Sequence, residues 1–303
     1  MDIAQLHENY AIPEHLSFDQ HEGLTRVHVQ VAGSSATIYL HGAHLTHWQP
    51  AGQEPVIFLS EKSDFAAGKA IRGGVPICFP WFGARSDGKT GPSHGYARIQ
   101  EWEMIFAALV PGIDGDQIYM TFALYPNDLS RSLGFDNLRA AYEVVIGKTL
   151  TLRLTVFNAG TEPQTIEEAL HAYFAVKDVR TTQLFGLELA LYLDKTDGFR
   201  KKVAPPSWLV LTGETDRVFP ANTATVRIDD LGNRRVITVE KTGSKTTVVW
   251  NPWSELAAKL ADMPDDAWPG FVCVETVNTA SDAITLKPGE KHVMQCMVSV
   301  AAT

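Results

Sequence analysis

Apolar and polar residues alternate along many short segments of this chain. The segment TLTLRLTVFN (149–158) places Leu150, Leu152 and Leu154 at every second position, with threonine and arginine between them. A period of two is typical of an antiparallel strand that buries one face. The same alternation predicts further strands at residues 25–31, 117–124, 185–193, 236–241, 246–250 and 292–300.

Turn-forming residues separate these segments, for example in AGTEP (159–163) and DDLGN (229–233). Many short strands divided in this way favour a sandwich or a barrel. Only one internal segment has a convincing helical pattern, residues 254–264. Ser254 is its expected N-cap, and Pro264 is expected to end it.

No repeat, low-complexity tract or linker divides the sequence. We therefore expect an all-β protein, a large antiparallel β-sandwich with one or two short helices. It should form a single domain over residues 1–303, in which residues 1–24 are an N-terminal extension.

Composition and charge exclude several classes of partner. The chain has 303 residues, 45% of them hydrophobic, and a formal net charge of −9. An acidic chain without a basic block is a poor ligand for nucleic acid or for an acidic membrane surface. Any site for an anion must therefore be built from a few local cations.

Cysteine usage and the first residues favour a cytoplasmic protein. The cysteines, Cys78, Cys273 and Cys296, are odd in number and contain no CxxC pair, which indicates reduced thiols. The N-terminus lacks the pattern of a signal peptide, and no apolar run reaches the length of a membrane span. The sequence gives no indication of the oligomeric state.

Two segments rich in glycine and aromatic residues carry cations. In AIRGGVPICFPWFG (70–83), Arg72 precedes two glycines, which allow the backbone to approach a ligand closely. The segment GPSHGYARIQEW (91–102) contains Ser93, His94 and Arg98. The arginines are either binding residues or ordinary surface cations.

Three further residues are candidates for chemistry. Glu275 follows an apolar run, and a carboxylate without a solvated face needs a specific reason to be there. His171, in EEALHAYFAV (167–176), is either a hydrogen-bonded core histidine or an acid/base catalyst. Asp216 lies in TGETDRVF (212–219), where it either pairs with a neighbouring arginine on the surface or serves the site.

The sequence contains no strong metal or cofactor motif. His41, His44 and His47 are spaced by three, so a strand would direct His44 to the opposite side from the other two. HExxH, GxGxxG, GxxxxGK[ST] and GxSxG are all absent. We therefore expect neither a metal site nor a nucleotide cofactor.

Several dispersed motifs together resemble one family. They occupy residues 72–83, 93–98, 167–174, 212–219, 249–253 and 271–276. In this order they are similar to the hexose-6-phosphate epimerase branch of the aldose 1-epimerase (galactose mutarotase-like) superfamily. The resemblance implies a β-supersandwich that interconverts the α and β anomers of glucose 6-phosphate.

The resemblance also implies roles for individual residues. By motif position it assigns the acid/base pair to His171 and Glu275. It assigns contacts with the sugar or the phosphate to the following residues: Arg72, Arg98, Asp216, Ser93 and His94.

The chemistry that this implies requires an acid and a base but no cofactor. Opening of the hemiacetal removes the proton from O1 and protonates the ring oxygen, and the roles reverse on closure. We expect Glu275 to be the base and His171 the acid, with Asp216 holding sugar hydroxyls or orienting the histidine. The alternatives are a non-catalytic sugar-binding module and a glycoside hydrolase that uses Asp216 and Glu275 as paired carboxylates.

Overall fold

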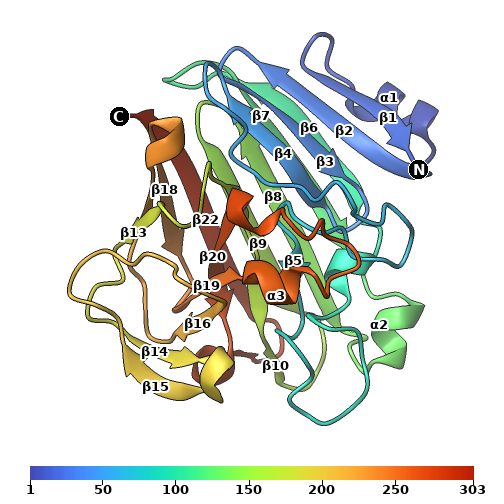
Figure 1. The fold of residues 1–303 in the computed structure, drawn as a ribbon. Helices are drawn as coiled ribbons and strands as arrows, with labels where there is room; N and C mark the ends of the chain where they lie inside the picture. The colour runs from blue at the N-terminus through green and yellow to red at the C-terminus, as the bar shows by residue number, and fades with distance from the viewer.

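The computed structural model describes residues 1–303 and consists mainly of antiparallel sheets (Figure 1). The N-terminal sheet contains, in chain order, β1 (Leu16–His21), β2 (Leu24–Val31), β3 (Ser34–Tyr39) and β4 (His44–Pro50). A first large sheet, the β9 sheet, runs in the order β13 (Gln183–Phe185), β17 (Val226–Asp230), β18 (Arg235–Thr242), β22 (Lys291–Ala302), β9 (Leu150–Asn158), β8 (Leu138–Ile146), β7 (Gln117–Leu124), β6 (Glu103–Val110).

A second large sheet, the β20 sheet, lies beside it. Its order is β15 (Arg200–Val203), β14 (Leu191–Asp194), β16 (Thr215–Phe219), β19 (Thr246–Asn251), β20 (Phe271–Asn278), β11 (Glu168–Leu170), β5 (Ile77–Cys78), and β12 (Tyr173–Ala175) also pairs with β20. Strands β10 (Gln164–Ile166) and β21 (Ile284–Leu286) form a separate pair. The helices are α1 (Ile3–Tyr10), α2 (Asp128–Ser132) and α3 (Trp253–Ala257).

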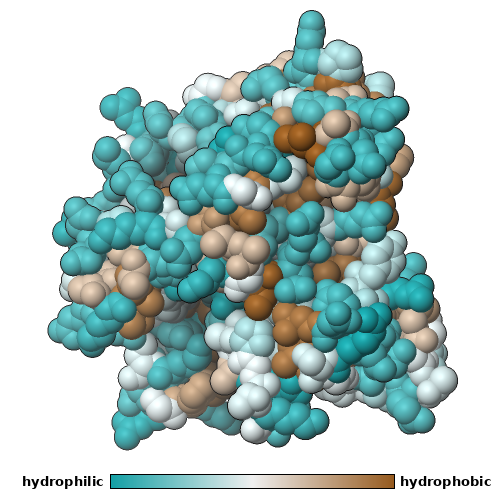
Figure 2. Space-filling view, turned by 90° about the vertical axis from the view of Figure 1, so that its right-hand side faces the viewer, coloured by the Kyte–Doolittle hydropathy of each residue, from teal (hydrophilic) through white to brown (hydrophobic).

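The main hydrophobic core joins all three sheets. It includes Val27 and Ile38 of the N-terminal sheet, Leu152 of the β9 sheet and Val274 of the β20 sheet. Hydrophilic residues cover most of the face drawn in Figure 2, and hydrophobic side chains appear there only in small areas. None of the helices combines the length and the apolar character needed to cross a membrane.

The alternation of apolar residues located most of the predicted strands correctly. Predictions over six segments are confirmed within two residues at each end by β2, β7, β9, β18, β19 and β22. The prediction over 185–193 is wrong, because β13 ends at Phe185 and β14 begins at Leu191. Gly186 turns the chain with φ +94°, and a Cβ on it would lie 2.1 Å from the carbonyl oxygen of Thr225.

The helix predicted over 254–264 is also corrected. Helix α3 ends at Ala257, and turns continue the chain as far as Met263. Ser254 is not the N-cap, because that position belongs to Pro252 and the side chain of Asn251 accepts the N–H of Trp253 at 2.9 Å.

The structure also contains three α-helices instead of one or two. Helix α1 lies in residues 1–24, where Asp2 and Gln5 form a capping box. The same segment adds β1, which pairs with β2 along its whole length and so becomes part of the N-terminal sheet.

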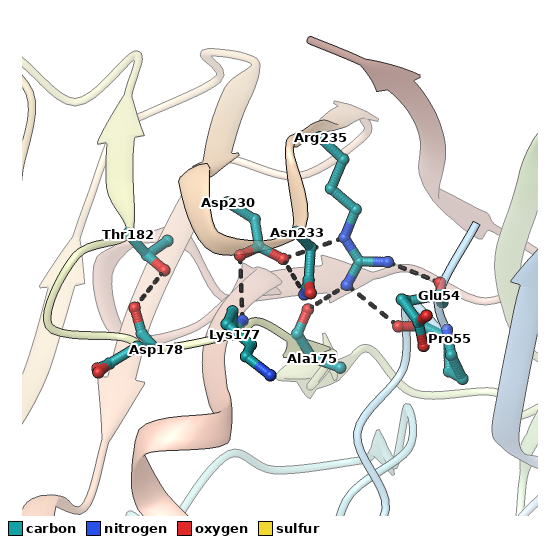
Figure 3. A network of polar contacts seen from close by, with 9 residues as sticks. All are labelled: Glu54, Pro55, Ala175, Lys177, Asp178, Thr182, Asp230, Asn233 and Arg235. Carbon is teal, nitrogen blue, oxygen red and sulfur yellow. Dashed lines mark hydrogen bonds and ion pairs between the residues drawn. The ribbon is translucent and has the colours of Figure 1, made fainter.

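A buried ion pair ties the β9 sheet to the segments beside it (Figure 3). The side chain of Arg235 is 1% exposed, and its Nε donates to Asp230 Oδ2 at 3.1 Å. Its other nitrogens donate to the carbonyl oxygens of Glu54, Pro55 and Ala175 at 2.6, 3.1 and 2.7 Å. Since Ala175 ends β12, this arginine fixes the strand that follows His171.

We predict that Arg235→Ala destabilises the protein by about 3–5 kcal/mol, because it leaves Asp230 buried without its counter-charge. Arg131, which is exposed and paired with Asp128, supplies the control, and Arg131→Ala should cost less than about 1 kcal/mol. Urea unfolding of both variants measures the difference. Similar small losses in both would show that the buried pair contributes little.

Candidate active site

The register of the β20 sheet places His171 directly opposite Glu275. Strand β11 pairs Leu170 with Thr276 of β20, so the next residue on one strand faces the preceding residue on the other. The two side chains meet, with His171 Nε2 3.5 Å from Glu275 Oε1. Directly opposed residues of this kind are the closest neighbours that a sheet offers.

The alternation of side chains along β20 turns Glu275 away from the main core. Val272 and Val274 belong to that core, whereas Val277 belongs to a small separate cluster on the other side. Glu275 shares the side of Val277, because residues two apart on a strand point the same way. Every residue of β20 is nevertheless buried, so the carboxyl is only 2% exposed.

Asp216 reaches the same face from the next strands. It pairs with Trp250 of β19, and Trp250 pairs with Cys273 of β20, so the three form a row across the sheet. Lys195, which follows β14, lies with its Nζ 2.6 Å from Asp216 Oδ2. Arg217 adjoins Asp216 and so points to the opposite side, where it lies over the ring of Tyr192.

The two glycines after Arg72 are required by close packing, Gly73 against residues 58–60 and Gly74 against β4. Gly73 has φ +98°, and its carbonyl oxygen lies 2.8 Å from His44 Nε2. A Cβ on Gly74 would lie 2.2 Å from the same nitrogen. Burial lowers the pKa of His44 to about 3, so this ring is neutral. It donates to Gly73 through Nε2, and only glycine allows the approach.

Arg72 itself contacts residues from two distant segments. Its Nε donates to Asp262 Oδ2 at 3.1 Å, and its Nη2 lies 3.0 Å from the same oxygen. Its Nη1 donates to the hydroxyl of Tyr173 at 3.2 Å. Arg72 therefore lies one side chain away from His171 and is already paired with a carboxylate.

His94 is held in a strained conformation beside His171. Its φ is +62°, which is uncommon outside glycine. The N–H of Gly83 donates to its Nδ1 at 3.2 Å, so the proton of the neutral ring is on Nε2. Burial, with Arg98 as the second cause, lowers its pKa to about 3. The ring meets His171 edge-on at 5.7 Å between centroids.

Arg98 and Ser93 lie beside this pair. Arg98 Nη2 donates to the carbonyl oxygen of Ser93 at 2.8 Å. Ser93 is exposed, and this contact involves its backbone, not its hydroxyl. The structure thus brings together six of the seven side chains expected from the sequence, and Ser93 joins them through its carbonyl group.

Burial sets the protonation of the central pair. It raises the pKa of Glu275 well above its ordinary value, and the charge of Asp216 raises it further. Burial also lowers the pKa of His171 well below its ordinary value, with His94, Arg98 and Arg72 as additional causes. Burial therefore favours the uncharged forms of both side chains, a protonated carboxyl and a neutral imidazole.

Unpaired polar atoms gather at this site. Four buried atoms without a hydrogen-bond partner in the protein belong to it, namely Arg98 Nε, His171 Nδ1, Asp216 Oδ1 and Glu275 Oε2. A buried polar group without a partner is costly, so a cluster of them points to a ligand that supplies the missing partners.

Sequence reasoning missed Tyr173, Trp250 and Asp262. Tyr173 was detectable in principle, because a residue two positions after His171 lies on the same side of a strand. Asp262 carried no signal, since it lies in a loop 190 residues from Arg72. Two of the three spaced histidines serve structural contacts, His44 with Gly73 and His41 through its Nε2 with the carbonyl oxygen of Lys69.

Comparison with known proteins gives a consistent result. The model of the aldose 1-epimerase family matches residues 26–299. A curated protein of Salmonella typhimurium named "Putative glucose-6-phosphate 1-epimerase" is 36% identical over 82% of this chain and 81% of its own. An Escherichia coli protein with the same name is 33% identical over 88% and 87%. The crystal structure of a "putative mutarotase" from Salmonella typhimurium superposes with a TM-score of 0.88 at 31% identity, covering 97% of this chain and 96% of that one.

We predict that Glu275→Gln raises Tm and that the gain widens from about pH 5 to about pH 8. A carboxyl whose pKa is raised by folding stabilises the protein when protonated, and this contribution is lost as the pH rises through the folded-state pKa. The amide of the variant stays neutral and loses nothing. Glu103→Gln, at an exposed position, is the control. A gain that does not change with pH would show that the pKa of Glu275 is ordinary.

Proposed function

This chain belongs to the aldose 1-epimerase family, and we propose that it interconverts the α and β anomers of glucose 6-phosphate. The observation that carries the proposal is the cross-strand pair of His171 and Glu275, 3.5 Å apart. Its members are an acid and a base with one exchangeable proton between them. The names of the relatives support a hexose phosphate as the substrate.

The pair can perform both halves of the reaction. When the shared proton is on His171, the carboxylate of Glu275 accepts the proton of O1 and the imidazole protonates the ring oxygen. The ring opens, the bond between C1 and C2 rotates, and closure on the other face reverses the two transfers. Burial favours the neutral pair in the empty site, whereas Lys195 and Arg98 lower the pKa of Glu275 and so favour the carboxylate.

The unpaired atoms around the pair suit a sugar. Asp216 Oδ1 can accept a hydrogen bond from a hydroxyl group, and the Nε2–H of His94 can donate one. Phe82 meets His94 edge-on at 4.8 Å, so an apolar ring borders these polar groups. Aromatic rings beside a few fixed polar groups are typical of a small-molecule site.

Local cations replace long-range attraction for the phosphate. The net charge of −9 repels a dianion at a distance, but Arg72 and Arg98 act on the pKa of His171 and Lys195 acts on that of Glu275. Of the three, Arg98 has a buried Nε without a partner, whereas Lys195 is paired with Asp216. We propose Arg98 and Arg72 as the phosphate contacts, because a guanidinium offers phosphate two parallel donors.

We predict that Glu275→Gln and His171→Asn each lower kcat for anomer exchange by about 10²-fold or more. The double variant should be little slower than either single one, because residues that act as a unit are not additive. Exchange of pure α anomer followed by NMR measures the rates above the spontaneous reaction. If the wild-type protein does not exchange the anomers, the chain is better explained as a sugar-binding module. Release of reducing sugar from a glycoside would indicate a hydrolase.

We predict that Arg98→Ala and Arg72→Ala raise KM for glucose 6-phosphate by roughly 10- to 150-fold, the equivalent of about 1.5–3 kcal/mol for a charge-assisted contact. KM for unphosphorylated glucose should change much less. Arg217→Ala, on the opposite side of β16, is the matched control. Equal rises of KM for both sugars would mean that these arginines hold the sugar ring or the fold, and not the phosphate.

A further inference from the structure

The imidazole of His171 lacks the hydrogen bond that usually orients an acid/base histidine. Such a ring commonly donates from its second nitrogen to a carboxylate or a carbonyl group, which fixes both its plane and its tautomer. Here Nε2 faces Glu275, and the buried Nδ1 has no partner in the protein. Another contact must therefore hold the plane of the ring.

Three rings enclose the imidazole. Tyr173 stacks on it with 4.9 Å between centroids and 11° between planes. Trp250 and His94 meet it edge-on, at 6.0 Å and 79° and at 5.7 Å and 67°. The parallel contact with Tyr173 covers a face of the imidazole, so it restricts tilting of the ring towards or away from Glu275.

Tyr173 is itself held at both ends. Its ring is 2% exposed and packs against Phe271 at 5.3 Å and Phe58 at 6.4 Å. Its hydroxyl accepts the N–H of Arg72 Nη1, and Asp262 binds the other side of that guanidinium. A chain of contacts thus runs from Asp262 through Arg72 and Tyr173 to the imidazole.

Two N–H groups of Arg72 remain without a protein partner in this arrangement. Nε donates to Asp262, and each terminal nitrogen makes one contact, Nη1 with Tyr173 and Nη2 with Asp262. One N–H of each terminal nitrogen is left for an anion. The same guanidinium can therefore bind the substrate and support the tyrosine.

We propose that Tyr173 is the positioning residue for His171: its ring, anchored through Arg72 and Asp262, replaces the missing hydrogen bond and keeps Nε2 aligned with Glu275. Tyr173 does not touch the reacting atoms in this role. The proposal rests on the proposed function for its kinetic part and on the geometry alone for its spectroscopic part.

The test compares Tyr173→Leu, which removes the aromatic face, with Tyr173→Phe, which keeps it. The imidazole C–H signals of ¹³C-labelled histidine are recorded, and His171 is assigned by its absence in His171→Asn. A stacked ring shifts these signals upfield. We expect the shift to disappear in Tyr173→Leu and to persist in Tyr173→Phe.

Kinetics on the same variants separate positioning from binding. Tyr173→Leu should lower kcat by up to about 10²-fold, as for a misplaced catalytic group, with little change in KM for glucose. Tyr173→Phe should retain most of kcat. Tyr192→Leu is the matched control, since Tyr192 is buried in the same sheet against Phe219 and outside the site. It should lower Tm without altering kcat.

If Tyr173→Leu does not fold, Asp262→Asn tests the same proposal. Asp265→Asn, at an exposed position, is its control. Loss of the anchoring charge should broaden or move the His171 signals in Asp262→Asn and leave them unchanged in Asp265→Asn. Unshifted His171 signals in wild type, or equal kcat losses in Tyr173→Phe and Tyr173→Leu, overturn the proposal. Upfield His171 signals in a wild-type protein that exchanges no anomers would refute the proposed function alone.

Discussion

The register between β20 and its partners β11 and β12 is the constraint on which the site depends. It sets His171 opposite Glu275, and the neighbouring pairs of β19 and β16 extend the same face to Trp250 and Asp216. A slip of one residue in a sheet sends every side chain to the other face. The apolar residues that alternate with these groups, such as Val272 and Val274, belong to the main core, so the core that stabilises the sheet also fixes the site.

The same burial that fixes the pair gives it unusual proton affinities. A carboxyl and an imidazole that are both removed from water resist ionisation, which drives the pKa of Glu275 up and that of His171 down. Both shifts favour the uncharged forms of the two side chains. The nearby cations Arg98 and Lys195 oppose the shift of Glu275 and keep the ionised form accessible. Buried atoms without a hydrogen-bond partner cost stability, and a ligand that pairs with them would recover part of that cost.

The cations of the site lie outside the strands of the β20 sheet. Arg72 is held by Asp262 and Tyr173, Lys195 by Asp216, and the backbone before Arg98 by the unusual conformation of His94. The contacts of Arg72 join segments far apart in the sequence. The buried Arg235 also joins distant segments, because it binds both the end of β12 and the segment that follows β4 (Figure 3). The proposed acid and base of the site thus lie on the β20 sheet, and its cations lie on loops that are held by contacts with other segments.

The sequence by itself determined the strands whose two faces differ, because alternation records burial directly. It failed at 185–193, where Gly186 turns an apolar run, and at 254–264, where the helix ends at Ala257 and Pro252, not Ser254, is the N-cap. It also made His171, Glu275, Arg72, Arg98 and Asp216 candidates, and the resemblance of their motifs to the aldose 1-epimerase family is what assigned them to a site. Only the tertiary structure decided that Tyr173 stacks on His171, that Asp262 binds Arg72 and that burial shifts the pKa of both members of the central pair towards their uncharged forms. Stacking, pairing and desolvation depend on distances between segments that register and packing bring together, and no local pattern in the chain encodes those distances.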